Sequence, residues 1–182
     1  CEWSEYNGLY QLDRPGWVWS YCTTPLGTSH YTIVSRLRSS AHEVYLAYTD
    51  ANVNADRRAV LIDNPDRVRV WYSASGYQDY QSLNIEKGKW YTTEVEVNDP
   101  QNKVSVWVDG NQTHNSVSMP DPVNGYVGLG HASNYLPGVS HFDYFLAYAG
   151  ARSASKSLAA LSVPEEFSFG AYPNPFNPST TI

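Results

Sequence analysis

The sequence consists largely of short runs of β-branched and aromatic residues separated by turn-forming residues. Such runs are typical of β-strands. They cover residues 17–21, 31–37, 43–48, 58–62, 67–72, 90–97, 103–108, 126–129 and 141–148. Turn signals at intervals of about eight to twelve residues indicate a two-sheet sandwich rather than alternating strands and helices. We therefore predict an all-β fold, a two-sheet antiparallel jelly-roll sandwich with a short extended C-terminal tail.

Two of these runs alternate strictly between valine and other residues. They are Arg67-Val68-Arg69-Val70 and Val104-Ser105-Val106-Trp107-Val108. Because successive side chains of a strand point to opposite faces, each run is predicted to bury its valines on one face of an antiparallel sheet. Asp109-Gly110 follows the second run directly. Glycine tolerates the positive φ of a tight turn, so a hairpin is predicted there.

Composition limits the classes of partner. Charged residues make up 16% of the chain and aromatic residues 14%, with 15 Tyr and 6 Trp, a mixture that suits twisted sheets. The net charge is -6 and there is no Lys/Arg cluster, so neither a nucleic acid nor an acidic membrane is expected as partner. No run of about eighteen apolar residues is present. We expect neither a transmembrane span nor a retained signal peptide.

The two cysteines, Cys1 and Cys22, allow two interpretations. An even pair in a chain with features of an exported protein predicts a disulfide between the N-terminus and the strand that ends near residue 22. The alternative is that Cys1 is a lipidated mature N-terminus, since a bacterial lipoprotein begins at cysteine after cleavage. The start at Cys1 also suggests that upstream residues were removed.

The C-terminal part differs in composition from the rest. Residues 149–161 are rich in Ala and Ser, and the run Tyr172-Pro173-Asn174-Pro175-Phe176-Asn177-Pro178 is rich in proline, which predicts an extended segment. We predict a sandwich domain over residues 1–149, a linker over 150–170 and a tail over 171–182. The tail resembles the opening of the C-terminal sorting domain of type IX secretion substrates. That resemblance implies an extracellular or outer-surface location on a bacterium, whereas the alternative is a proline-rich linker without targeting meaning.

Four further motifs follow one another in a fixed order. They are Glu86-Lys87-Gly88-Lys89-Trp90-Tyr91, Val104-Ser105-Val106-Trp107-Val108-Asp109-Gly110, Gly125-Tyr126-Val127-Gly128-Leu129-Gly130 and Phe142-Asp143-Tyr144-Phe145. This order resembles the concanavalin A-like, laminin-G-like jelly rolls over residues 3–148. The resemblance implies a scaffold that hosts lectins, carbohydrate-binding modules, adhesion domains and some glycosidases. It also implies a structural role for Asp143 in the closing motif.

Aromatic residues are the candidates for carbohydrate contact. A pyranose ring exposes a face of C–H bonds that stacks on a Trp or Tyr ring, and the polar tip of the ring can form a hydrogen bond. One stretch, expected to be a loop, combines aromatic residues with Ser, Gln and Asp, and a second loop lies near residue 135. The candidate residues are Trp71, Tyr72, Tyr77, Tyr80, His131 and Tyr135. The alternative for each is burial in the aromatic core of the sandwich.

A possible cation site lies in the run 50–56. Asp50, Asn52, Asn54 and Asp56 place oxygen-bearing side chains at alternate positions, a spacing by which a loop can wrap a hard cation. The run lacks the central Gly and the bidentate Glu of an EF-hand loop, and a polar hairpin has the same composition. Because calcium is common among the laminin-G-like proteins that the chain resembles, calcium is the cofactor to test, and none is required.

The sequence offers little for catalysis. Glu94 and Glu96 have the alternate spacing of a retaining glycosidase pair, but they lie on a run that resembles an outward-facing strand of the family, without a third acidic residue. The histidines do not have metal-ligand spacing, and no Gly-x-Ser-x-Gly or Cys/His nucleophile motif is present. The histidines are His30, His42, His114, His131 and His141. No catalytic residue is predicted.

These observations lead to three hypotheses from different classes. The first is a secreted or cell-surface carbohydrate-binding module, non-catalytic, that binds polysaccharide or a cell-surface glycan through an exposed aromatic patch. The second is a self-assembling structural or adhesive subunit of an extracellular filament or surface layer, since abundant Tyr suits a large interface and an extended tail can add a strand to a neighbour's sheet. The weakest is a glycoside hydrolase or lyase.

Overall fold

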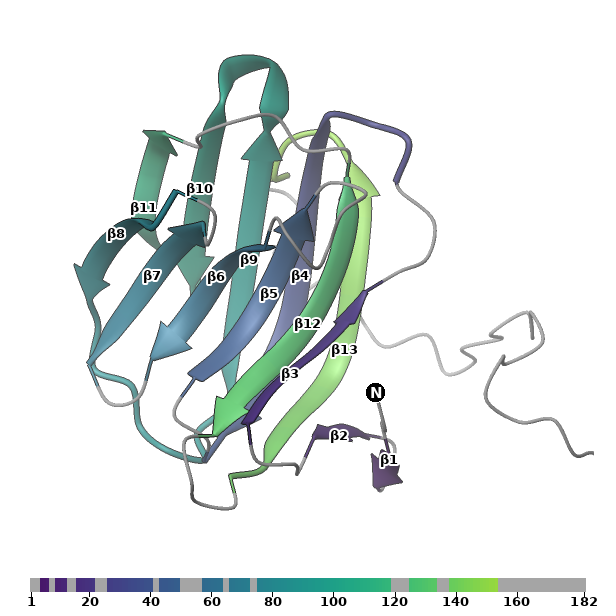
Figure 1. The fold of residues 1–182 in the computed structure, drawn as a ribbon, viewed down its shortest axis with the longest axis vertical. Helices are drawn as coiled ribbons and strands as arrows, with labels where there is room; N and C mark the ends of the chain where they lie inside the picture. The colour runs from purple at the N-terminus through teal and green to yellow at the C-terminus, as the bar shows by residue number, and fades with distance from the viewer. Residues whose placement is uncertain are drawn as a thin grey trace, which may run out of the picture. The chain divides into compact units, whose positions relative to one another are not determined.

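A computed structural model of the chain describes residues 4–6, 9–12, 16–21, 26–40, 43–49, 57–63, 66–72, 75–118, 125–133 and 138–153. These residues form two antiparallel sheets that face each other, which confirms the predicted all-β jelly-roll sandwich (Figure 1). The chain divides into a compact unit Cys1–Arg152 and a segment Ser153–Ile182. The predicted tail over 171–182 lies outside the described residues.

The six-stranded sheet carries most of the sequence between residues 43 and 82. Its strands, in spatial order, are β3 (Gly16–Tyr21), β12 (Tyr126–Ser133), β5 (Glu43–Thr49), β6 (Arg57–Asp63), β7 (Arg67–Tyr72) and β8 (Tyr77–Ser82). Three successive hairpins join β5 to β8, so β7 and β8 lie together at one side of this sheet (Figure 1).

The seven-stranded sheet contains the strands nearest both ends of the described chain. Its strands, in spatial order, are β1 (Ser4–Tyr6), β2 (Leu9–Leu12), β13 (Ser140–Ala149), β4 (His30–Ser39), β9 (Tyr91–Asn98), β10 (Lys103–Val108) and β11 (Asn111–Ser118). A 3-10 helix, η1 (Asp99–Gln101), joins β9 to β10. The chain therefore crosses from one sheet to the other several times, as a jelly roll requires.

The predicted hairpin after β10 is confirmed. Val108 pairs with Asn111, and the two residues between them, Asp109 and Gly110, both have positive φ, 49° and 79°. Two positive φ values in a two-residue loop match the right-handed twist of the strands on either side. The side chain of Asp109 also accepts a hydrogen bond from the backbone N–H of Thr92, 2.8 Å long, which ties the turn to β9.

The core lies between the sheets and is built mainly from valine, isoleucine and leucine. The predicted alternation holds on β7, where Val68 and Val70 are buried, and on β10, where Val104, Val106 and Val108 are buried. Full burial of one such side chain contributes about 1.5–3 kcal/mol. Because the side-chain period of a strand is two, these inward valines oblige the residues between them to lie on the outer faces.

Two histidines are buried where the sheets meet. His131 on β12 lies 3.0 Å from Ser140 Oγ on β13, and Ser140 Oγ lies 2.6 Å from Ser39 Oγ on β4. His114 on β11 donates from Nε2 to the backbone oxygen of Asp79 on β8, 3.3 Å away. Each histidine thus links one sheet to the other, and the hydrogen bonds offset the cost of burying a polar ring.

Several predicted features can be placed only in part. Among the residues that the structure describes, no helix is long and apolar enough to span a membrane. Cys1, Cys22 and the candidate cation residues Asp50, Asn52, Asn54 and Asp56 lie outside the described residues, so the disulfide and the calcium site stay predictions.

The burial of His114 predicts a loss of stability in acid. Burial lowers the pKa of His114 below its usual value of about 6.5, and the nearby Asp79 raises it by less. As the pH falls, the histidine therefore takes up a proton in the unfolded chain at a higher pH than in the folded chain. The contribution of the buried, neutral His114 to the free energy of unfolding is thus present above the unfolded pKa of about 6.5 and decreases as the pH falls below it. We expect urea unfolding midpoints to fall less between pH about 7.5 and about 5.5 in His114→Gln than in the wild-type protein. Equal pH dependence in both proteins would contradict this assignment.

Candidate functional site

The outer face of the six-stranded sheet is the face turned away from the seven-stranded sheet. On β6, Val60 and Ile62 belong to the core between the sheets, whereas Ala59 and Leu61 form a separate buried cluster with Trp71 of β7. This split follows the two-residue period of a strand. Trp71 therefore packs on the outer face, at the side of the sheet that β7 and β8 form.

Strand register brings residues from six strands into straight rows across this sheet. Directly opposed residues of neighbouring strands lie on the same face. One row is Trp19, Gly130, Tyr45, Leu61, Arg69 and Tyr80; the next is Tyr21, Gly128, Ala47, Ala59, Trp71 and Gln78; a third is Trp17, Ala132, Glu43, Asp63, Arg67 and Ser82. On β7 and β8, where the side chains are described, the rows contain Arg67, Arg69, Trp71, Gln78, Tyr80 and Ser82.

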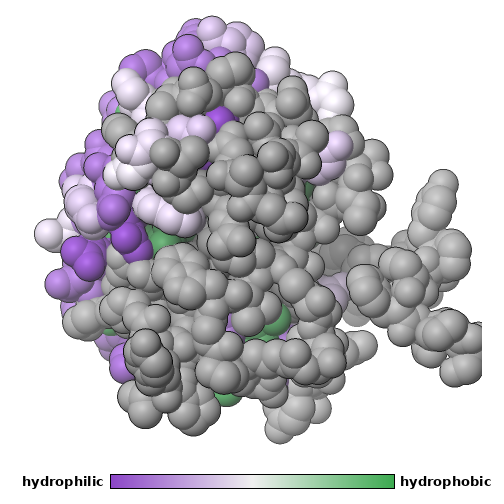
Figure 2. Space-filling model, viewed as in Figure 1, coloured by the Kyte–Doolittle hydropathy of each residue, from purple (hydrophilic) through white to green (hydrophobic). Residues whose placement is uncertain are grey.

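The accessible part of this face lies on β7 and β8. We call it the β7–β8 face and define it by Arg67, Arg69, Trp71, Gln78 and Tyr80. Tyr80 is 47% exposed, Gln78 and Arg67 are exposed, and Trp71 and Arg69 are half-buried. Figure 2 shows hydrophilic residues gathered along the left of the view, the side on which Figure 1 shows β7, β8 and β11.

Cations and an amide surround the ring of Tyr80. The guanidinium carbons of Arg67 and Arg69 lie 5.0 Å and 5.9 Å from the ring centroid, within the range of cation–π attraction. Arg69 Nη1 donates to Gln78 Oε1 at 3.1 Å, and the Tyr80 hydroxyl donates to the same oxygen. The face therefore combines an exposed aromatic ring with several hydrogen-bond donors, the composition by which proteins hold polar ligands that also have apolar surface.

The structure separates the predicted aromatic residues. Residues 67–72 form β7, as predicted, whereas residues 77–82, expected to be a loop, form β8 and pair with it, so alternate residues go to opposite faces. Tyr72 is buried beneath the guanidinium of Arg58, whose carbon lies 4.5 Å from the ring centroid, and it offers no surface to a ligand. Tyr77 is the register partner of Tyr72, and its side chain is not among those described. Among the members of the group whose side chains are described, Trp71 and Tyr80 lie together on the outer face.

The second predicted platform does not form around His131. His131 is 0% exposed and hydrogen-bonded to Ser140 in the core, so its ring cannot meet a ligand from solvent. Glycine and serine around it in the sequence led to the expectation of a loop, but β12 runs from Tyr126 to Ser133 between β3 and β5 of the six-stranded sheet. Tyr135 lies outside the described residues.

The outer face of the seven-stranded sheet carries a second aromatic–arginine cluster. Arg36 and Arg38 place their guanidinium carbons 5.0 Å and 4.8 Å from the centroid of the same ring of Trp90. Arg36 Nη1 also donates to Asp143 Oδ2 at 2.8 Å, with both side chains partly exposed. The role of Asp143 expected from the family resemblance is consistent with this bond, because it holds β13 and β4 together across the sheet.

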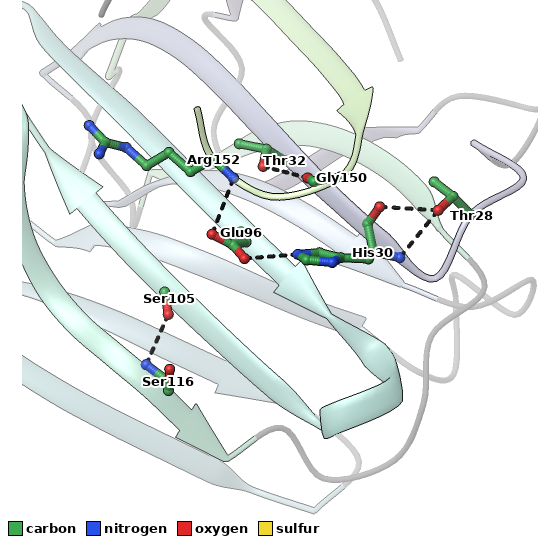
Figure 3. Close-up of polar contacts among 8 residues, drawn as sticks. All are labelled: Thr28, His30, Thr32, Glu96, Ser105, Ser116, Gly150 and Arg152. Atoms are coloured by element: carbon green, nitrogen blue, oxygen red, sulfur yellow. Dashed lines mark hydrogen bonds and ion pairs between the residues drawn. The ribbon is translucent and has the colours of Figure 1, made fainter. Parts of the chain in front are cut away.

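Glu94 and Glu96 are both engaged by the segment that follows β13. Arg152 donates from Nε and Nη2 to the two carboxylate oxygens of Glu94, at 2.8 Å and 3.0 Å, and its guanidinium carbon lies 4.7 Å from the centroid of Trp107. Figure 3 shows Glu96 between the backbone N–H of Arg152, 3.2 Å away, and His30 Nε2, 2.8 Å away. Each carboxylate therefore has partners within the chain, and Glu94 is buried.

Backbone contacts hold the same segment against β4. Gly150 donates to the backbone oxygen of His30 at 2.7 Å, and Thr32 Oγ1 donates to the backbone oxygen of Gly150 at 3.0 Å (Figure 3). Gly150 has φ of 94°, a conformation that other residues rarely adopt. The chain thus turns after β13 and crosses the outer face of the seven-stranded sheet as far as Arg152, which is also where the compact unit ends.

Sequence reasoning missed the residues that need strand register to be recognised. Arg67 and Arg69 were expected only as the exposed side of an alternating strand, and their position over Tyr80 depends on the pairing of β7 with β8.

Among the described residues, no group of three or more His, Cys, Asp or Glu side chains could hold a metal ion.

Comparison with known proteins identifies the fold. No protein-family model matches the sequence, and a search of curated proteins gave no match. Among solved structures, the chain is similar to the carbohydrate-binding module CBM66 from Bacillus subtilis, with a TM-score of 0.66, 13% identity, and coverage of 81% of this chain and 91% of the other. It is also similar to a glycosidic hydrolase (TM-score 0.58, 14% identity, 83% and 82% covered) and to a heptameric SAP-like pentraxin from Limulus polyphemus (TM-score 0.55, 12% identity, 80% and 77% covered). At such low identity the likeness establishes the jelly-roll fold alone.

The bonds of Arg152 predict that its removal destabilises the domain. In Arg152→Ala, Glu94 stays buried but loses a two-bond partner, and a lost hydrogen bond to a charged group costs about 1.5–3 kcal/mol. We expect a decrease of this size in the free energy of unfolding measured with urea. Arg152→Lys, which keeps the charge but not the planar fork, is expected to lose less. Lys87→Ala, at an exposed position, serves as the control; equal stability of Arg152→Ala and the wild-type protein would contradict the assignment.

Proposed function

We propose that this domain binds polysaccharide through the β7–β8 face and does so without catalysis. The observation that carries the proposal is the exposed ring of Tyr80, which lies on the same outer face as Trp71, its diagonal neighbour in the strand register, and has Arg67, Arg69 and Gln78 around it. The ring supplies an apolar surface for the C–H face of a sugar, and the side chains around it supply donors for hydroxyl oxygens.

Two further observations support this function. A domain of similar fold is a carbohydrate-binding module, although similar folds also occur in a glycosidic hydrolase. Glu94 and Glu96, which have the spacing of a glycosidase pair, are occupied by Arg152 and His30. A carboxylate that is held in a two-bond ion pair is poorly placed to attack a sugar or to transfer a proton. The engagement of the two glutamates favours binding over hydrolysis, whereas the fold is compatible with either.

The proposed location is outside the cell. It rests on the sequence of residues 172–178, which resembles the opening of a type IX sorting domain. A secreted domain that binds polysaccharide would attach its full-length protein to a cell surface or to an extracellular substrate. Detection of the protein in the culture medium or on the cell surface, and its loss from there when residues 171–182 are deleted, is the expected result for this part of the proposal.

Two tyrosines of similar exposure on opposite sheets provide the test of the binding face. Tyr80 is 47% exposed on the six-stranded sheet, and Tyr10 is 43% exposed on the seven-stranded sheet. We expect Tyr80→Ala to weaken polysaccharide binding by about 1 kcal/mol or more, the energy of an aromatic stacking contact, and Tyr10→Ala to leave it unchanged. Affinity electrophoresis in gels that contain soluble polysaccharides, with each variant checked for folding by circular dichroism, measures both.

Trp71→Ala is expected to act in the same direction as Tyr80→Ala, with an added loss of stability because Trp71 also packs on Ala59 and Leu61. Equal binding by wild-type protein, Tyr80→Ala and Trp71→Ala would remove the β7–β8 face as the binding site. Release of reducing sugars from a bound polysaccharide by the purified domain would instead show that the domain is catalytic.

A further inference from the structure

Two hydrogen-bond donors converge on one side-chain oxygen of the β7–β8 face. Arg69 Nη1 donates to Gln78 Oε1 at 3.1 Å, and the Tyr80 hydroxyl donates to the same atom. Gln78 is exposed, and its register partner is Trp71, so this oxygen lies at the accessible surface between the two candidate aromatic residues. An oxygen at this place is therefore held by a cationic donor and a phenolic donor together.

A second arginine lies next to this pair. Arg67 precedes Arg69 by two positions on the same face of β7, and its guanidinium carbon is 5.0 Å from the centroid of the Tyr80 ring. Its side chain is 44% exposed. The carboxylate of Asp66 lies nearby, with Oδ1 3.9 Å from Arg67 Nε, and the register partner of Arg67 on β6 is Asp63. A guanidinium has planar forked donors that match the geometry of a carboxylate or a sulfate.

We propose that the β7–β8 face takes an anionic polysaccharide, in which a carboxylate or sulfate oxygen replaces Gln78 Oε1 between Arg69 and Tyr80. The proposal rests on the proposed function and names its ligand class. An ionised oxygen is a stronger acceptor for a guanidinium than an amide oxygen, because charge-assisted hydrogen bonds are roughly twice as strong as neutral ones. In the absence of a ligand, Gln78 Oε1 accepts the hydrogen bonds that the ligand oxygen would accept, and the Gln78 side chain rotates away when the glycan binds. The sugar ring then contacts Tyr80 and Trp71.

We expect the side chains of the β7–β8 face, and not the net charge of the whole chain, to attract the anionic polysaccharide. The whole chain carries a net charge of -6, so its overall field repels a polyanion rather than attracting it. The seven-stranded sheet provides a matched comparison: Arg36 is 46% exposed and lies 5.0 Å from the centroid of Trp90, almost the same values as Arg67 beside Tyr80. Arg36, however, is bonded to the carboxylate of Asp143 at 2.8 Å. A general attraction between arginine and polyanion would involve both clusters equally.

Pairs of polysaccharides that differ only in charge test the proposal. Polygalacturonate and its methyl ester differ in the carboxylate, and dextran sulfate and dextran differ in the sulfate. The dissociation constant of the domain is measured for each by titration of its tryptophan fluorescence. We expect the charged member of at least one pair to bind at least about tenfold more tightly than the neutral member, and this preference to decrease as salt is added. The pair that shows the preference tells carboxylate from sulfate.

Four variants locate the effect. Arg69→Gln and Arg67→Gln are expected to reduce the preference for the charged polysaccharide, and Arg36→Gln to leave it unchanged. Gln78→Glu places a carboxylate of the protein where the ligand oxygen is proposed to lie, so it should weaken binding of the charged polysaccharide by at least about tenfold. Gln78→Ala removes the internal competitor and should keep or increase that affinity. If Gln78 instead bound sugar hydroxyls directly, Gln78→Ala would weaken binding.

The outcomes separate this inference from the proposed function. Equal binding of charged and neutral members, with a loss in Tyr80→Ala, overturns the anionic ligand and leaves polysaccharide binding in place. Equal losses in Arg67→Gln and Arg36→Gln overturn the assignment to the β7–β8 face. A fluorescence signal that does not change with any of the four polysaccharides, together with no retardation in the affinity gels, overturns both proposals.

Discussion

The apolar contact between the two sheets determines where every other group of this domain lies. Valines from both sheets meet with no exposed surface, for example Val60 and Val68 from one and Val95 and Val106 from the other. A strand that turns one residue inward must turn the next one outward, and a slip by one residue would exchange the two faces. The outward position of Arg69 is therefore a consequence of the burial of its neighbours in β7.

Buried hydrogen bonds restrict the relative position of the two sheets. Packing of aliphatic side chains is tolerant of small shifts, whereas a hydrogen bond between fixed atoms is not. The contact of His131 with Ser140 and the bond from His114 to the backbone of Asp79 join β12 to β13 and β11 to β8. These two links lie on different strands of each sheet, so together they restrict how one sheet can slide over the other. The packing of the core depends on this alignment of one sheet with the other. The rows of residues on the outer faces depend on the strand register within each sheet.

Much of the fold could be predicted from local sequence, and much of the site could not. The fold class, the burial pattern of β7 and β10 and the turn at Asp109-Gly110 follow from a period of two and from glycine chemistry, which are local properties. Strand β8 was missed because Tyr-Gln-Asp-Tyr-Gln-Ser has no aliphatic residue. The expectation that Tyr72 contacts a ligand was wrong, because Tyr72 shares the two-residue period of Val68 and Val70 and is buried with them. The ion pair of Glu94 with Arg152 joins residues 58 positions apart. No local pattern contains such information.

The two aromatic–arginine clusters show why residue type alone does not define a site. In both, two arginines two positions apart on one strand lie over one aromatic ring. On the seven-stranded sheet, the carboxylate of Asp143 partly neutralises Arg36 and fixes it to a neighbouring strand. On the six-stranded sheet, Arg69 donates to the amide oxygen of Gln78, and Gln78 is exposed. A carboxylate acceptor within the chain competes directly with an anionic ligand, whereas an exposed amide oxygen is a weaker acceptor that an ionised ligand oxygen can replace.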